Sequence, residues 1–199
     1  MSQVLPMRTR STRSPKLAAL SDEGLARACA AGDPAAIGAL FDRFQPRVTR
    51  YLRRLVHEDA VEDAVQAVFI EVARGKAVYD GRASVNTWLF AIATNVARHE
   101  RRSFARRRRL GAALRSLPPR GSTEPQRLDA RDLLEHANLA LRALSAPLRE
   151  AFVLCELEGL SAAEAAQALE TSEAAIWKRV SKARKAIRQQ VLGEKGSRS

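Results

Sequence analysis

Residues 161–188 read SAAEAAQALETSEAAIWKRVSKARKAIR, which predicts two short helices joined by a tight turn, the second strongly basic. Ser161 and Glu164 have the spacing of a capping box, in which a hydroxyl and a carboxylate bind the unpaired backbone N–H groups at a helix start. Thr171 or Ser172 is predicted to begin the second helix. This is the pattern of a helix-turn-helix.

The second helix is predicted to have one buried face and one cationic face. Apolar residues recur every three or four positions on the first face, namely Ile176, Val180, Ala183, Ile187 and Val191. Polar and basic residues share the other face or flank it: Lys178, Ser181, Lys182, Lys185, Arg179, Arg184 and Arg188. A DNA recognition helix requires this arrangement. The alternative is a solvated basic helix in a bundle.

The charge of the whole chain supports a nucleic-acid partner. The 199 residues include 34 Lys and Arg against 22 Asp and Glu, which gives a formal net charge of +12. A surplus of this size favours a polyanion, and nucleic acid fits better than a membrane surface. The sequence has no run of 18 apolar residues, so we expect no membrane insertion.

Neither an enzyme nor a metal protein is expected. Cys29 and Cys155 lie in helical apolar patterns without metal-ligand spacing, which indicates a reducing cytosol and hence a cytoplasmic protein. His57, His99 and His136 are scattered, and no nucleophile–base pair or cofactor cradle is evident. We therefore predict no catalytic residues, no metal site and no cofactor.

The predicted architecture is all-α, with two small helical domains joined by a flexible linker. Residues 117–125 contain three prolines and a glycine without an apolar pattern, which is typical of a linker. The predicted division is a disordered basic arm (1–20), a first domain (21–110), the linker (111–127), a helix-turn-helix domain (128–192) and a tail (193–199).

Helix-start signals divide the first domain. Ser21 precedes one short helical pattern, and Asp33-Pro34 combines an N-cap carboxylate with proline at the first helical position. A third helix is expected from about residue 60 to 74. Ser84 is then expected to cap a helix that continues to Arg109.

Three features of the first domain are candidate contact surfaces. Glu62, Asp63, Gln66 and Glu71 form an acidic patch, for which a protein partner or an ordinary solvated face are the alternatives. A polar loop at residues 80–87 leads into a helix in which Trp88 is expected to face the core. Residues 98–109 contain seven arginines, which suit phosphate contacts better than a localisation signal.

The order of motifs resembles the bacterial group 4, or extracytoplasmic-function (ECF), sigma factors of the sigma-70 family, over about residues 33–190. The matching segments are Glu62-Asp63-Ala-Val-Gln66-Ala-Val-Phe69, Thr87-Trp88-Leu89, Ile92-Ala93-Thr94-Asn95, the arginines that follow, Glu158-Gly-Leu-Ser161 and Arg179-Val-Ser-Lys-Ala-Arg184. Each motif is weak alone, but their order and spacing are specific.

The resemblance implies a promoter-specificity subunit of RNA polymerase with a region 2-like and a region 4-like domain. The implied polymerase-binding residues are Glu62, Asp63, Gln66 and Phe69. The implied contacts to the promoter −10 element are Arg82, Ser84, Asn86, Asn95, Arg98, Arg101 and Arg102. The implied −35 contacts are Ser172, Ala175, Trp177, Lys178, Arg179, Ser181, Lys182, Arg184 and Lys185. Core RNA polymerase, promoter DNA and an anti-sigma factor are the implied partners.

Four residues depart from the family pattern. Glu170 stands where glycine is usual in the turn, Trp177 where a basic residue is common, Val85 where phenylalanine is common and His99 where aspartate is common. The turn must therefore form without an easy left-handed residue. These departures affect promoter choice rather than the class of protein.

The alternative function is a stand-alone helix-turn-helix regulator. That class needs a sensing domain, and residues 33–109 show neither strand patterns nor a phosphate-binding glycine loop. For a sigma factor, we expect the two free domains to tumble semi-independently and to bind promoter DNA poorly until polymerase fixes their separation.

Overall fold

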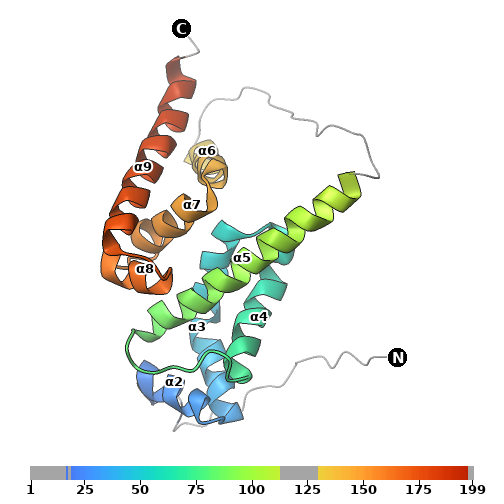
Figure 1. The fold of residues 1–199 in the computed structure, drawn as a ribbon, viewed down its shortest axis with the longest axis vertical. Coiled ribbons are helices and arrows are strands. Elements are labelled where there is room, and N and C mark those ends of the chain that lie inside the picture. The colour runs from blue at the N-terminus through green and yellow to red at the C-terminus, as the bar shows by residue number, and fades with distance from the viewer. Residues whose placement is uncertain (1–16, 18, 113–129, 197–199) are drawn as a thin grey trace.

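The computed structural model describes residues 17, 19–112 and 130–196, and all of the regular structure in these ranges is helical (Figure 1). It contains two helical domains, as predicted. Most of the predicted arm and linker and the last three residues of the tail lie outside the described residues. Within the described part, no helix is both long and apolar enough to cross a membrane.

The first domain contains α2 (Asp22–Ala30), α3 (Pro34–Leu55), the 3-10 turn η1 (Glu58–Ala60), α4 (Val61–Ala73) and α5 (Val85–Ala112). All three predicted N-caps are confirmed. Ser21 Oγ accepts from the Gly24 N–H at 3.1 Å, and Asp33 Oδ1 accepts from the Ala35 N–H at 2.9 Å. The Ser84 hydroxyl accepts from the Thr87 N–H at 3.1 Å. These bonds satisfy donors that a helix start leaves unpaired.

Tyr51 of α3 connects this helix to α5 inside the first domain. Its ring centroid lies 4.8 Å from that of Phe90, and its hydroxyl lies 2.7 Å from Thr94 Oγ1. The Thr94 hydroxyl donates to the Phe90 carbonyl, so Tyr51 donates to Thr94. Burial raises the pKa of Tyr51 well above its usual range. This pairing fixes the middle of α5 against α3.

The second domain contains α6 (Ala130–Ala143), α7 (Ala146–Phe152), the π-helix η2 (Val153–Leu157), α8 (Ala162–Ala168) and α9 (Glu173–Gly196). The start signal at Ser145-Ala-Pro147 predicts one helix that continues to Gly159, and in the structure this helix is divided into α7 and η2. Its last turn widens, since the Glu158 N–H donates to the Val153 carbonyl at 2.9 Å. Gly159 then takes a φ of 76°, which ends the helix.

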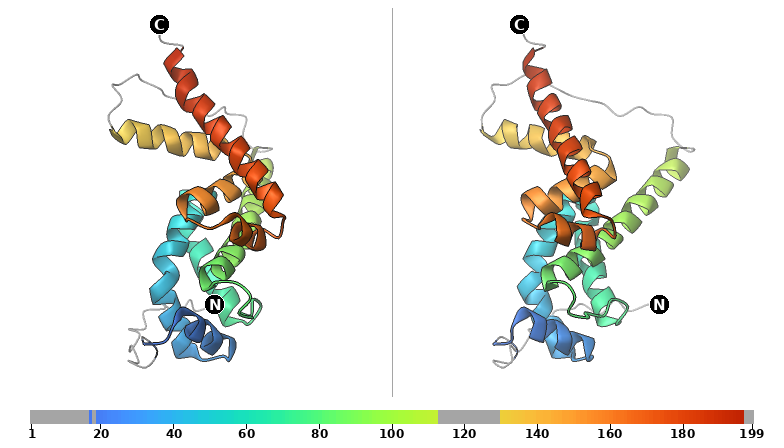
Figure 2. Two further views of the ribbon diagram at one scale, coloured as in Figure 1. Left: turned by 90° about the vertical axis from the view of Figure 1, so that its left-hand side faces the viewer. Right: turned by 60° about the vertical axis from the view of Figure 1, so that its left-hand side comes forward.

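The two domains pack against each other and share one buried core. α8 lies against α5, and α6 and α7 approach α3 (Figure 2). This arrangement differs from the semi-independent tumbling expected from the linker. The contact consists of buried apolar residues of both domains and of ion pairs between them, which the linker composition gives no means of predicting.

Candidate nucleic-acid and polymerase interface

The turn of the helix-turn-helix forms around Glu170 in the left-handed region, with a φ of 52°. The Thr171 N–H donates to the Ala166 carbonyl at 2.9 Å and the Glu170 N–H to the Gln167 carbonyl at 3.3 Å, as in a Schellman motif. The predicted capping box at Ser161 and Glu164 is confirmed. Its hydrogen bonds, from the Ser161 N–H and hydroxyl, lower the pKa of Glu164.

The buried face of α9 follows the predicted pattern. Ile176, Val180 and Ala183 are buried and Ile187 is half-buried, whereas the side chain of Val191 lies outside the described residues. Trp177 is 61% exposed, so it does not belong to the buried face of α9. α9 therefore presents a large aromatic side chain on its outer surface.

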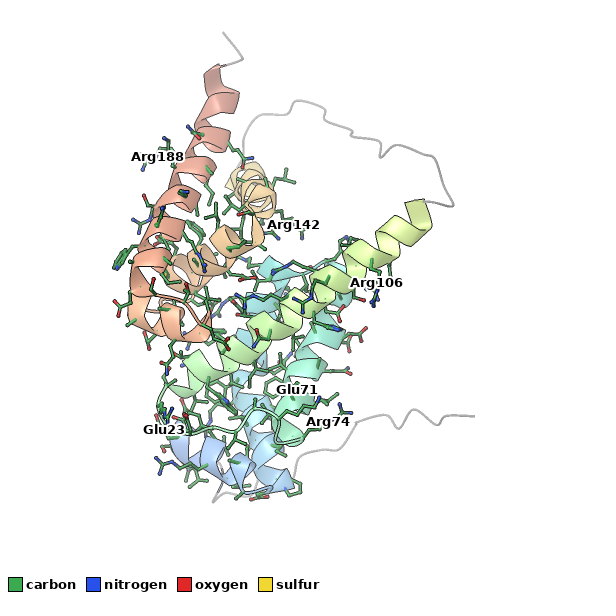
Figure 3. The ribbon with its side chains drawn as sticks, in the orientation of Figure 1. Glu23, Glu71, Arg74, Arg106, Arg142 and Arg188 are labelled. Carbon is green, nitrogen blue, oxygen red and sulfur yellow. The ribbon has the colours of Figure 1, made fainter. Side chains whose placement is uncertain are left out.

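The predicted −35 residues lie at the start and on the outer side of α9. Ser172 caps the helix, because its Oγ accepts from the Ala175 N–H at 3.3 Å. Exposed members are Trp177, Lys178, Ser181, Lys182, Arg184 and Lys185, while Ala175 and Arg179 are half-buried. Arg184 donates to Glu156 Oε1 at 2.6 Å. Figure 3 shows Arg188 projecting outward from the same helix.

Internal hydrogen bonds and an aromatic pair order the loop before α5. Asp80 Oδ1 accepts from the Arg82 N–H at 3.0 Å, and the Tyr79 hydroxyl donates to the Ala83 carbonyl at 2.8 Å. The Tyr79 and Trp88 rings lie 5.3 Å apart, so half-buried Trp88 packs within the protein as expected. The loop thus exposes the side chains of Arg82 and Ser84.

Two of the predicted −10 arginines are engaged by the second domain. Arg98 donates through Nε and Nη2 to Glu150 Oε2 at 3.2 and 2.9 Å, and Arg101 donates to Glu150 Oε1. Asn95 and Arg102 are exposed on α5, and Asn86 is half-buried at its start. Arg106 also projects outward (Figure 3). The structure therefore leaves only part of the predicted −10 set free.

A second buried carboxylate joins the domains through α3. Arg50 Nε and Nη2 donate to Glu158 Oε1 and Oε2 at 3.0 and 2.7 Å, and Arg47 Nη2 donates to the Glu158 carbonyl at 3.0 Å. The Glu158 carboxylate raises the pKa of Arg50 through hydrogen bonds and charge attraction. Sequence reasoning missed Arg47, Arg50 and Glu150 and gave Glu158 no contact. A glutamate among apolar helical residues, as at Glu150, was the available signal.

α4 presents three of the four residues of the predicted acidic patch to solvent. Glu62, Asp63 and Gln66 are exposed, whereas Glu71 is half-buried and pairs with Lys76 at 3.5 Å. Phe69, expected among the polymerase contacts, is only 5% exposed, and its ring packs edge-on against Phe41 at 4.8 Å. Its apolar ring belongs to the core, so it anchors the buried face of α4. Residues of α3 and α4 line a groove of about 380 Å³ beside the patch: Phe41, Gln45, Thr49, Val65 and Gln66.

The sequence matches two family descriptions in the order of the two domains. Residues 40–109 match Sigma-70 region 2, and residues 137–187 match Sigma-70 region 4. The first range covers the core of the α3–α5 bundle and the second the helix-turn-helix. The chain therefore belongs to the sigma-70 family.

The chain is also similar to curated proteins named ECF RNA polymerase sigma-E factor. The ECF RNA polymerase sigma-E factor of Haemophilus influenzae is 26% identical over 86% of this chain and 96% of its own length. That of Escherichia coli K12 is 29% identical over 84% and 93%.

Solved structures share the fold. CnrH in complex with the cytosolic domain of CnrY has a TM-score of 0.64 at 26% identity, covering 86% of this chain and 97% of CnrH. The sigma factor RpoE of Bartonella quintana, in complex with the anti-sigma factor NepR, has a TM-score of 0.63 at 24% identity, covering 76% and 94%.

Proposed function

We propose that this sigma factor docks on core RNA polymerase through α4, holds the promoter −10 element with α5 and its preceding loop, and reads the −35 element with α9. The observation that carries this proposal is the exposure of an acidic α4 and a basic α9 on separate faces (Figure 1). A protein that joins a basic partner to DNA needs two such surfaces. Its role is to direct initiation rather than to catalyse a reaction, in the cytoplasm, where polymerase and promoters are.

The docking assignment rests on Glu62, Asp63 and Gln66. They are exposed on one helix beside a groove of mixed polar and apolar lining, while Phe69 anchors that helix in the core. Acidic and amide side chains beside such a groove suit a protein partner with a basic surface.

The −10 assignment rests on a preformed loop beside a cationic helix. Arg82, Asn95 and Arg102 expose groups that can bind phosphates or base edges. Arg98 and Arg101 join them once they leave Glu150. An unstacked base would meet a loop whose backbone is already held by Asp80 and Tyr79, which lowers the entropy lost on binding.

The −35 assignment rests on the N-terminal half of α9. Lys178, Lys182 and Lys185 are exposed and available to phosphates, and Trp177 offers an apolar surface to a thymine methyl group or a sugar. The solved relatives CnrH and RpoE are complexed with CnrY and NepR, the latter an anti-sigma factor, and we extend to this chain control by such a partner.

The test is run-off transcription with core polymerase on a genomic fragment library. We expect defined start sites only when the protein is present, and aligned upstream sequences that reveal two elements. The D63A/Q66A variant should lose polymerase association and initiation while keeping its DNA affinity. Asp42→Ala is the control, because Asp42 is exposed on α3 and does not line the groove.

Two outcomes would contradict the assignment. Normal assembly of the D63A/Q66A variant with polymerase would show that α4 is not the docking surface. Specific DNA binding without any polymerase association would instead favour the stand-alone regulator.

A further inference from the structure

Two carboxylates of the second domain are buried against arginines of the first. Glu150 is 1% exposed and binds Arg98 and Arg101, while Glu158 is 6% exposed and binds Arg47 and Arg50. These four arginines and two glutamates define the interdomain seam. The partners are separated by 49 to 111 residues of sequence, so each pair links the two domains directly.

We propose that the seam is an autoinhibitory latch, in which Glu150 occupies two arginines that promoter phosphates would otherwise bind and Glu158 holds the domains together through Arg47 and Arg50. This inference rests on the proposed function, because it assigns Arg98 and Arg101 to the −10 contact. An Arg guanidinium binds carboxylate and phosphate oxygens with the same planar fork of donors. One arginine cannot serve both partners at once in this geometry.

The second domain also contacts the loop that precedes α5. α8 packs against α5, and Gln167 Nε2 of α8 lies 3.5 Å from the Arg82 carbonyl as a hydrogen-bond donor. The second domain therefore covers the part of the assigned −10 surface that contains Arg98 and Arg101, whereas Asn95 and Arg102 stay exposed. DNA access to Arg98 and Arg101 requires the second domain to move away.

The ion pairs of the seam contribute little net free energy to the closed arrangement. Burying ion pairs removes charges from water, and this cost largely cancels their attraction. The net stabilisation by these ion pairs is smaller still, because Arg47 Nε and Arg101 Nη1 are buried without a hydrogen-bond partner among the described atoms. Opening returns both sets of charges to water. α4 lies on the opposite side of α5 from α8 and α9 (Figure 1), so polymerase can dock before the seam separates.

Two substitutions break the seam with opposite changes in net charge. Glu150→Gln removes a negative charge, whereas Arg50→Gln removes a positive charge from a residue outside the assigned DNA surfaces. Each has a matched control whose ion pair lies within one domain. Glu156→Gln frees Arg184 from a 2.6 Å pair, and Arg43→Gln frees Asp22 from a 2.8 Å pair.

The measurements use the full chain without polymerase. Small-angle X-ray scattering gives the radius of gyration, and fluorescence anisotropy with a labelled duplex of arbitrary sequence gives DNA affinity. Both seam variants should expand relative to wild type, and both should bind DNA more tightly. If the wild-type chain is nine-tenths closed, the gain approaches about tenfold. Arg50→Gln is the more decisive variant. Its loss of a positive charge would by itself weaken DNA binding, so tighter binding by this variant can only come from opening.

The controls should keep the wild-type radius, and Glu156→Gln measures how much a lost negative charge raises affinity when it also releases Arg184, a residue of the assigned −35 surface. An Arg50→Gln chain with the wild-type radius and weaker DNA binding overturns the latch. Circular dichroism checks that helix content is kept. If Glu150→Gln unfolds, Arg50→Gln alone decides, since the Arg50 side chain is 55% exposed and its loss leaves no cavity. Because polymerase is absent from these assays, a failed latch and a failed sigma assignment remain distinguishable.

Discussion

Glu170 illustrates how far single residues could be predicted. The sequence places a glutamate where the turn of a helix-turn-helix calls for glycine, and the structure confirms a left-handed residue there, at a φ of 52°. The position was predictable because caps and turns depend on neighbours in sequence. The partners of Glu150 were not, because nothing local to Glu150 indicates arginines about 50 residues away.

We expect Glu170→Gly to stabilise the protein. A left-handed L-residue costs about 1–2 kcal/mol, whereas glycine adopts this conformation without a Cβ clash but loses more freedom on folding. The net gain in the free energy of unfolding should be about 0.5–1 kcal/mol, measured by urea denaturation. Glu170→Ala is the control and should give no gain, because alanine keeps the Cβ. Equal stabilisation by both substitutions would show that side-chain charge, not backbone strain, sets the effect.

Cys29 should make stability fall at alkaline pH. Burial, together with the nearby Asp33 charge, raises the pKa of its thiol from 9.0 to about 11. The unfolded chain therefore loses this proton first. The stabilisation is complete below about pH 9 and is lost as pH rises to about 11, with an upper bound of about 3 kcal/mol.

The measurement for Cys29 is urea denaturation at about pH 8 and about pH 11 in wild type and Cys29→Ala. The alanine variant should lose less stability between the two conditions, because it has no thiol to ionise. All other ionisable groups are the same in the two proteins, so their contributions cancel in the comparison. An equal loss in the two proteins would refute the assignment to Cys29.

At the scale of elements, periodicity and caps predicted most helices to within a few residues. Helix α4 was expected from about 60 to 74 and spans Val61–Ala73. The π-helix η2 could not be predicted, since its widened turn is defined by hydrogen bonds such as that from Glu158 to the Val153 carbonyl, not by a local residue pattern. Phe69 was misplaced because a motif match does not distinguish a surface contact from an anchor beneath it.

Helix α9 carries a prediction of its own. Lys182→Ala and Lys185→Ala together remove two exposed cations from the assigned −35 surface. Affinity for duplex DNA should fall, and the slope of log affinity against log salt should become shallower by about 2, because two fewer counterions are released. Anisotropy titrations over a range of salt concentrations measure both quantities.

Gln189→Ala is the control for the lysine variants, because Gln189 is exposed on the same helix and uncharged. It should leave the salt slope at the wild-type value. Unchanged slope and affinity in the double lysine variant would remove this part of α9 from the DNA interface.

At the scale of the whole molecule, the sequence predicted the two domains and their order but not their contact. Each domain has local signals, namely caps, apolar stripes and a Pro-rich boundary. Their packing depends on Glu158 meeting Arg50, 108 residues away, and on Glu150 meeting Arg98, 52 residues away. Charge pairing over such distances leaves no periodic signal, and the strong positive charge of the chain conceals which cations are already occupied.

The occupied arginines also bear on how a scarce protein finds polymerase in a cell full of DNA. A genome offers on the order of 10⁶–10⁹ nonspecific sites, and a chain of net charge +12 would be sequestered by them. Glu150 and Glu158 hold four arginines in internal ion pairs, so the closed chain presents fewer free guanidinium groups to chromosomal DNA. A larger share of the copies is then free to reach polymerase.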